Sequence, residues 1–173
     1  MNSFGITGYE QILIGLYLIA HGLIHLIFLI YVKDEKTNNY TGWSRSSWLL
    51  DKILSRQFTK ITGFITWIVI AILFVISGLG ILDILPLNEL LSPILIIVSI
   101  LAIGGYIVFF NGLSPTPYHW ILGIVIDLLI LCFIGFFSDN ALLFLLLLLI
   151  VWLYGMVFHT RVLSFTLKEN TTI

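Results

Sequence analysis

Five long apolar runs, separated by polar segments, dominate the pattern of this chain. The runs, numbered here as spans one to five, cover residues 9–32, 61–82, 90–110, 118–137 and 141–160. An apolar helix of about 20 residues can cross the roughly 30 Å hydrocarbon core of a bilayer. The runs are continuously apolar and do not alternate, which argues against a transmembrane β-barrel. The pattern predicts an all-α, polytopic transmembrane helix bundle, with residues 1–173 forming a single integral membrane domain.

Short turns rich in residues that break helices separate the later spans. They cover residues 83–89, 111–117 and 138–140. Turns of this length make neighbouring helices run antiparallel. In span three, the pair Ser92-Pro93 is typical of a helix start, because proline is favoured in the first turn.

The basic residues are distributed unevenly between the segments that flank the spans. The segment after span one contains Lys33, Lys36, Arg45, Lys52, Arg56 and Lys60. Arg161 and Lys168 follow span five, whereas the three short turns contain no Lys or Arg. With five spans both basic segments lie on the same side, and the positive-inside rule places them in the cytoplasm. The N-terminus is then outside and the C-terminus inside.

Within the first polar segment, residues 46–58 show an amphipathic pattern. The apolar residues fall near a spacing of four, with polar residues between them; they are Trp48, Leu50, Ile53, Leu54 and Phe58. We expect a short cytoplasmic helix that lies in the membrane surface between spans one and two.

Composition strengthens the membrane assignment and excludes some functions. Mean hydropathy is +1.11 and 10% of the residues are charged, against roughly 25% in soluble domains. A net charge of −1 argues against a nucleic-acid partner. The single cysteine, Cys132, excludes an internal disulfide and is expected to be buried. The expected location is the cell membrane, with the lipid bilayer, and as a candidate another membrane subunit, as partners.

Few ionisable residues lie inside the spans, and span one contains Glu10, His21 and His25, with Tyr17 between them. Glu10, Tyr17, His21 and His25 are separated by seven, four and four positions, which places them in one stripe of a helix. Polar side chains inside a bilayer are costly and tend to face the protein interior or a wet cavity. Asp127 lies near the middle of span four, at the depth of His21, so contact between the two is possible.

The nearby Gly15 and Gly22 would let another helix approach span one closely.

Three interpretations of this stripe remain open. In the first, the histidines only hold helices together through hydrogen bonds; in the second, they line a ligand pocket or proton path. Alternatively, His21 and His25 bind a metal or haem b, with Asp127 or Glu10 as a further ligand, since histidines four positions apart can share one metal. The sequence contains no phosphate-binding loop and no G-x-S-x-G nucleophile motif. No catalytic residue is assigned, and the sequence favours a protein that is not an enzyme.

The stretch His21-Gly-Leu-Ile-His25-Leu26 resembles the H-G-L-x-H-L first span of a group of small, uncharacterised prokaryotic membrane proteins. Some of these are labelled ABC transporter permeases, although they have no nucleotide-binding part of their own. The resemblance extends loosely over spans one to four, including a mid-helix polar residue, here Asp127. In hydropathy the chain is also similar to small four-helix proteins of the DoxX kind, which are linked to redox partners.

The resemblance implies a prokaryotic, non-enzymatic membrane subunit or small permease-like component. The alternative from the residues is a membrane redox protein that uses His21 and His25 to hold a metal or haem. We therefore expect no cofactor in the first case, and a metal or haem b in the second.

Overall fold

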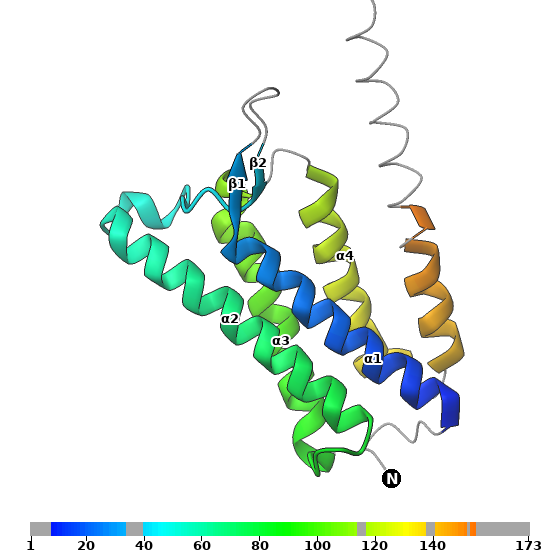
Figure 1. Cartoon of the computed structure of the whole chain (residues 1–173). Helices are drawn as coiled ribbons and strands as arrows, with labels where there is room; N and C mark the ends of the chain where they lie inside the picture. The colour runs from blue at the N-terminus through cyan, green and yellow to red at the C-terminus, as the bar shows by residue number, and fades with distance from the viewer. Residues whose placement is uncertain (1–7, 34–39, 114–116, 138–140, 152, 155–173) are drawn as a thin grey trace, which may run out of the picture.

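The computed structural model describes residues 8–33, 40–113, 117–137, 141–151 and 153–154. This part of the chain is mostly helical (Figure 1). The helices are α1 (Gly8–His25), α2 (Arg56–Ile81), α3 (Asn88–Phe109), α4 (Pro117–Cys132) and a further apolar helix, Ala141–Val151. Within the described residues, three apolar segments, Gly8–Leu29, Arg56–Ile81 and Asn88–Gly112, are long enough to cross a membrane. The predicted helical, membrane-compatible architecture is confirmed to this extent.

Helices that follow one another in the chain pack together, and α1 and α2 make the most extensive contact. Glycines permit this close approach. A Cβ atom at Gly78 would lie 2.6 Å from the carbonyl oxygen of Gly15, and one at Gly22 would lie 2.8 Å from that of Ala71. The expectation that Gly15 and Gly22 allow close helix packing is confirmed.

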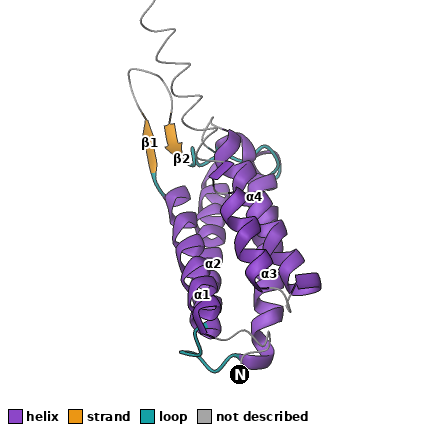
Figure 2. Cartoon of the chain, turned by 90° about the vertical axis from the view of Figure 1, so that its right-hand side faces the viewer, coloured by secondary structure: helices purple, strands orange, loops and turns teal. Residues whose placement is uncertain are grey.

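A short β-hairpin at one end of the bundle departs from the all-α expectation (Figure 2). Strands β1 (Tyr31–Lys33) and β2 (Tyr40–Gly42) pair antiparallel, with Tyr31 opposite Gly42. Gly42 has a φ of +90°, and a Cβ atom there would collide with the carbonyl oxygen of Ile30. A glycine is therefore required where β2 returns to the end of α1.

The hairpin explains why the first helix is shorter than the predicted span of residues 9–32. After His25 the chain tightens into a 3₁₀ turn, Leu26–Leu29, and Ile30 is extended with φ −95° and ψ 144°. The last residues of the apolar run form β1, whose three residues are all exposed. Apolar composition alone did not distinguish a strand from the end of a helix.

The predicted amphipathic helix over residues 46–58 is wrong. A single 3₁₀ turn, Leu50–Lys52, forms there, and α2 begins at Arg56 after an N-cap at Ser55. The polar groups of this segment bind the end of α3 instead of forming a helix. The Ser47 hydroxyl donates to the Val108 carbonyl at 2.7 Å, and Trp48 Nε1 donates to the Ile107 carbonyl at 2.8 Å. The segment thus satisfies carbonyl groups that the last turn of a helix leaves free.

The start of the third helix also differs from the prediction. Helix α3 begins at Asn88, two positions before Leu90, and Pro93 lies inside it. The first turn packs closely against α2, where Leu87 and Leu91 lie over Gly80. The proline removes one backbone hydrogen bond near the start of the helix but does not set its beginning.

The remaining spans agree in position with the apolar runs. Helix α4 continues into a π-helical segment, Phe133–Phe137, so that together they cover residues 117–137. Span five is helical over Ala141–Val151, and its predicted end near residue 160 lies outside the described residues. Cys132 is exposed, contrary to its predicted burial, because it lies on the outer face of α4.

The two ends of the bundle are held by different contacts. At the hairpin end, the Ser44 amide donates to the Gly112 carbonyl at 2.6 Å, which joins the first polar segment to the turn after α3. At the other end, Gln11 Nε2 donates to Asp83 Oδ2 at 2.9 Å, which joins the start of α1 to the turn after α2. Helices α1, α2 and α3 therefore alternate in direction.

Candidate functional site

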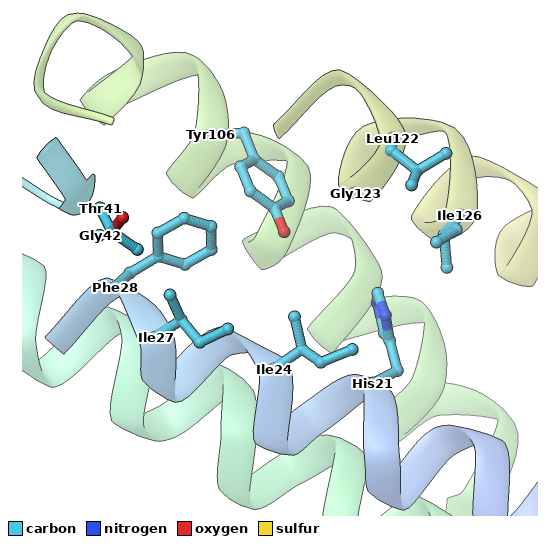
Figure 3. Close-up of a pocket in the computed structure, with 10 residues that line it drawn as sticks. All are labelled: His21, Ile24, Ile27, Phe28, Thr41, Gly42, Tyr106, Leu122, Gly123 and Ile126. Atoms are coloured by element: carbon cyan, nitrogen blue, oxygen red, sulfur yellow. The ribbon is translucent and has the colours of Figure 1, made fainter. Parts of the chain in front are cut away.

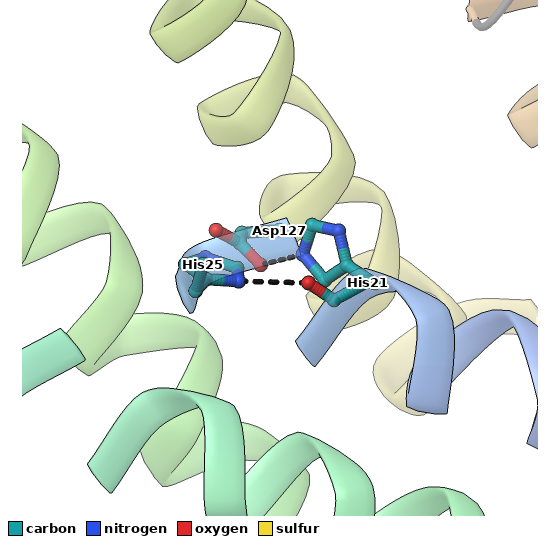
Figure 4. Close-up of side chains that lie close together, drawn as sticks. All are labelled: His21, His25 and Asp127. Carbon is teal, nitrogen blue, oxygen red and sulfur yellow. Dashed lines mark hydrogen bonds and ion pairs between the residues drawn. The ribbon is translucent and has the colours of Figure 1, made fainter. Parts of the chain in front are cut away.

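The centre of the site is a buried pair between α1 and α4. The Nε2 atom of His21 lies 3.0 Å from Oδ1 of Asp127 (Figure 4), and the two residues are 4% and 0% exposed. The contact that their equal depth made possible is present. This polar contact joins α1 to α4, and these two helices are not among the extensively packed pairs of the bundle.

His25 lies one turn further along α1, and its neighbours fix which ring nitrogen carries the proton. Its Nδ1 atom lies 2.9 Å from the carbonyl oxygen of His21. A carbonyl can only accept, so His25 Nδ1 is the donor. In neutral His25 the Nε2 atom is then an acceptor, and the Tyr106 hydroxyl, 3.2 Å away, donates to it.

Aromatic side chains surround the two imidazoles. Phe74 of α2 meets His21 edge-on at 4.8 Å between ring centroids, and Trp67 stacks with His25 at 6.1 Å. Tyr17 lies nearly parallel to His21, with centroids 6.0 Å apart. These rings exclude water from one side of the pair and hold the imidazoles in place.

The predicted stripe comes together only in part. Tyr17, His21, His25 and Asp127 form one cluster, whereas Glu10 is half-buried and lies eleven positions before His21, about 16 Å along a helix axis. Within the described residues no contact joins Glu10 to the cluster. Tyr106 was missed by the sequence analysis. The available signal was a polar aromatic residue inside an otherwise apolar span.

One polar atom of the pair is unsatisfied. Asp127 Oδ2 is buried and has no hydrogen-bond partner among the described residues. A buried polar atom without a partner is rare and costly. A proton, a water molecule, a cation or a ligand group would remove this cost.

A cavity of about 270 Å³ lies beside the pair, between α1, α3 and α4 (Figure 3). Thr41 and Gly42 of the hairpin close one end of it. The side chains drawn in Figure 3 converge on this space, with the Tyr106 hydroxyl pointing into it. The residues that line the cavity are His21, Ile24, Ile27, Phe28, Thr41, Gly42, Tyr106, Leu122, Gly123 and Ile126.

The histidines and Asp127 can also be compared with the ligand geometry that a metal ion requires. His21, His25 and Asp127 each offer a ligand atom, and these atoms lie within 4.8 Å of one another. Two ligands bound at about 2.1 Å to one metal can be no more than about 4.2 Å apart. The donor types fit a transition metal, but the hydrogen-bonded arrangement would have to contract to bind one.

Comparisons with known proteins found no match, so the interpretation of the site rests on its geometry. No family model matches the chain, and neither a curated protein nor a solved structure matches it.

Proposed function

We propose that this chain is an integral membrane protein that binds a small molecule in a cavity between α1 and α4, as a small permease-like component or membrane subunit without catalytic activity. Its outer surface supports the membrane location. Large apolar side chains are exposed along the helices, for example Leu23 at 51%, Ile97 at 59% and Leu142 at 65%. Such a surface is typical of contact with lipid or with another membrane protein.

The observation that carries the binding proposal is the cavity itself. Its wall includes Ile24 and Ile27, which are 54% and 43% exposed, and its volume of about 270 Å³ reaches inward to the buried His21. An opening that leads from the surface to a buried polar pair is more than that pair needs in order to hold helices together. A largely apolar cavity with a few converging polar groups is the usual form of a small-molecule site.

We further propose five spans across the cytoplasmic membrane of a prokaryote, with the basic segment of residues 33–60 inside. The contact between Ser44 and Gly112 supports this, because it joins two segments that a five-span arrangement places on the same side. The contact between Gln11 and Asp83 supports it at the opposite side.

Thiol labelling tests whether the cavity admits small molecules. In a Cys132→Ala background, which removes the exposed native thiol, Ile126→Cys places a thiol on the cavity wall. Ile130→Cys is the matched control, one turn further along α4, where the native side chain is 1% exposed and does not line the cavity. We expect methyl methanethiosulfonate to modify the first thiol much faster than the second.

Filling the cavity provides the second half of this test. Ile24→Trp adds bulk to the cavity wall and should slow modification of the thiol at position 126. Equal rates at positions 126 and 130, or no effect of the tryptophan, would remove the support for a binding cavity.

The second candidate function is a metal- or haem-binding redox protein, which the convergence of His21, His25 and Asp127 favours. Purified protein would then contain stoichiometric metal by elemental analysis, or show a Soret band. His21→Leu would abolish that content, whereas Tyr17→Phe would leave it unchanged. Metal-free, colourless protein would exclude this candidate.

A further inference from the structure

The lining of the cavity favours a neutral and mainly apolar ligand. The aliphatic and aromatic residues Ile24, Ile27, Phe28, Leu122 and Ile126 form most of the wall, and none of the lining residues that the structure describes is Asp, Glu, Lys or Arg. An engineered cavity of about 150 Å³ can hold benzene, so about 270 Å³ provides room for one ring with a short substituent. A charged ligand would meet no counter-charge on the described part of this wall.

The Tyr106 hydroxyl gives the cavity a definite hydrogen-bonding character. Its proton is directed to His25 Nε2, because His25 Nδ1 already donates to the carbonyl of His21. The phenolic oxygen has further lone pairs and points into the cavity (Figure 3). Tyr106 therefore offers the ligand an acceptor and not a donor.

His21 adds a second acceptor when Asp127 is a carboxylate. A carboxylate can only accept, so His21 Nε2 then donates to Asp127 and the Nδ1 atom of a neutral ring keeps its lone pair. Among the described residues this Nδ1 atom makes no hydrogen bond, and His21 lines the cavity. With Asp127 ionised, His21 on α1 and Tyr106 on α3 thus both match a ligand that donates, and Tyr106 does so whether or not Asp127 carries a proton.

Gly123 shows that the wall is shaped around this oxygen. A Cβ atom at Gly123 would collide with the Tyr106 hydroxyl group. Any larger residue at position 123 would therefore push the tyrosine side chain out of the position in which it bonds to His25.

We propose that the cavity binds a neutral, lipid-soluble molecule that carries a hydroxyl group on or near a ring, and that this hydroxyl donates a hydrogen bond to the oxygen of Tyr106. This inference rests on the proposed function and names the chemical class of its ligand. The apolar body of the molecule packs against α1 and α4, and the hydroxyl lies between Tyr106 and His21.

A matched pair of probes tests the donor requirement. para-(Trifluoromethyl)phenol has a hydroxyl donor, whereas its methyl ether, para-(trifluoromethyl)anisole, has the same ring and fluorine reporter without the donor. Binding of each to the purified full chain in detergent is followed by fluorine NMR, with protein-free micelles measuring the partition of each probe. We expect saturable binding of the phenol, with the ether about fivefold weaker after correction for partition, the effect of one neutral hydrogen bond.

Two tyrosine variants locate the acceptor. Tyr106→Phe removes only the hydroxyl and should abolish the preference for the phenol. Tyr17→Phe is the matched control, since Tyr17 stacks on His21 but does not line the cavity, and it should keep the preference. If Tyr106→Phe does not fold, as judged by circular dichroism, the two probes on the wild-type chain decide the question.

Each other outcome overturns the inference. Equal binding of the two probes, or binding of neither, would exclude a hydroxyl donor as the recognised group. Equal loss of preference in both tyrosine variants would exclude Tyr106 as the acceptor. These results are separate from failure of the proposed function, which the thiol-labelling rates at positions 126 and 130 report independently.

Discussion

The contribution of the His21–Asp127 pair to the free energy of unfolding can be measured by removing one partner. His21→Leu removes the imidazole that lies 3.0 Å from Oδ1 of Asp127. The carboxyl group is 0% exposed and its Oδ2 atom already has no partner among the described residues, so the variant would leave both oxygens unsatisfied. A buried polar group left without a partner costs about 1–3 kcal/mol. We expect His21→Leu to lower the free energy of unfolding by an amount in this range.

A double-mutant cycle separates the pair from the cost of each substitution. His21→Leu and Asp127→Leu each strand the other partner, whereas the double variant removes both polar groups. Side-chain hydrogen bonds between membrane helices contribute about 0.6 kcal/mol on average and up to about 1.7 kcal/mol. We expect the loss in the double variant to be smaller than the sum of the single losses by about 1 kcal/mol.

Thr59→Ala provides the control for additivity. Thr59 is buried in α2, fifteen positions before Phe74, which touches His21, and this separation is about 22 Å along the helix. Combined with Asp127→Leu, it should give additive losses to within about 0.5 kcal/mol. The assay is reversible unfolding in mixed detergent and SDS micelles, followed by circular dichroism. Additive losses for the His21 and Asp127 variants would refute the reasoning that this pair ties α1 to α4.

Three further outcomes are expected. Gly78→Ala should lower the free energy of unfolding by about 1–3 kcal/mol, because its Cβ would lie 2.6 Å from a backbone oxygen of α1. Gly104→Ala is the control in the same unfolding assay and should be neutral or slightly stabilising, because a Cβ atom there would have no neighbour within 4 Å. Ser47→Ala should cost about 1 kcal/mol and speed amide exchange over residues 47–54, because it loses the hydrogen bond to α3; unchanged exchange would contradict the capping role. A reporter active only in the cytoplasm should be active when fused after Lys168 and silent within residues 83–89, and the reverse pattern would overturn the proposed orientation.

The apolar pattern was sufficient to predict the helices because a membrane imposes a simple local rule. A run of about 20 apolar residues satisfies its backbone hydrogen bonds as a helix without reference to the rest of the chain. Periodicity likewise placed Tyr17, His21 and His25 on one face of α1, since that placement depends only on the helical repeat. The depth of Asp127 in its span was likewise enough to predict that contact with His21 was possible.

The predictions from the sequence were wrong where the structure of a segment depends on contacts with residues elsewhere in the chain. Residues 46–58 have an amphipathic pattern, yet Ser47 and Trp48 bind carbonyl groups of α3, and a helix would direct them elsewhere. The first turn of α3 packs over Gly80, which is far from the local signal of Pro93. The return of β2 depends on Gly42 meeting Ile30.

The sequence by itself determined which residues could form the site, and the tertiary structure decided which of them meet. Glu10 shares the face of His21 but lies too far along the helix, whereas Tyr106, on another helix, completes the hydrogen-bond chain through His25. The cavity lies between α1, α3 and α4 beside the His21–Asp127 pair, and Gly123 leaves room there for the Tyr106 hydroxyl. Such a space depends on how separate helices pack, and no local pattern in the sequence encodes it.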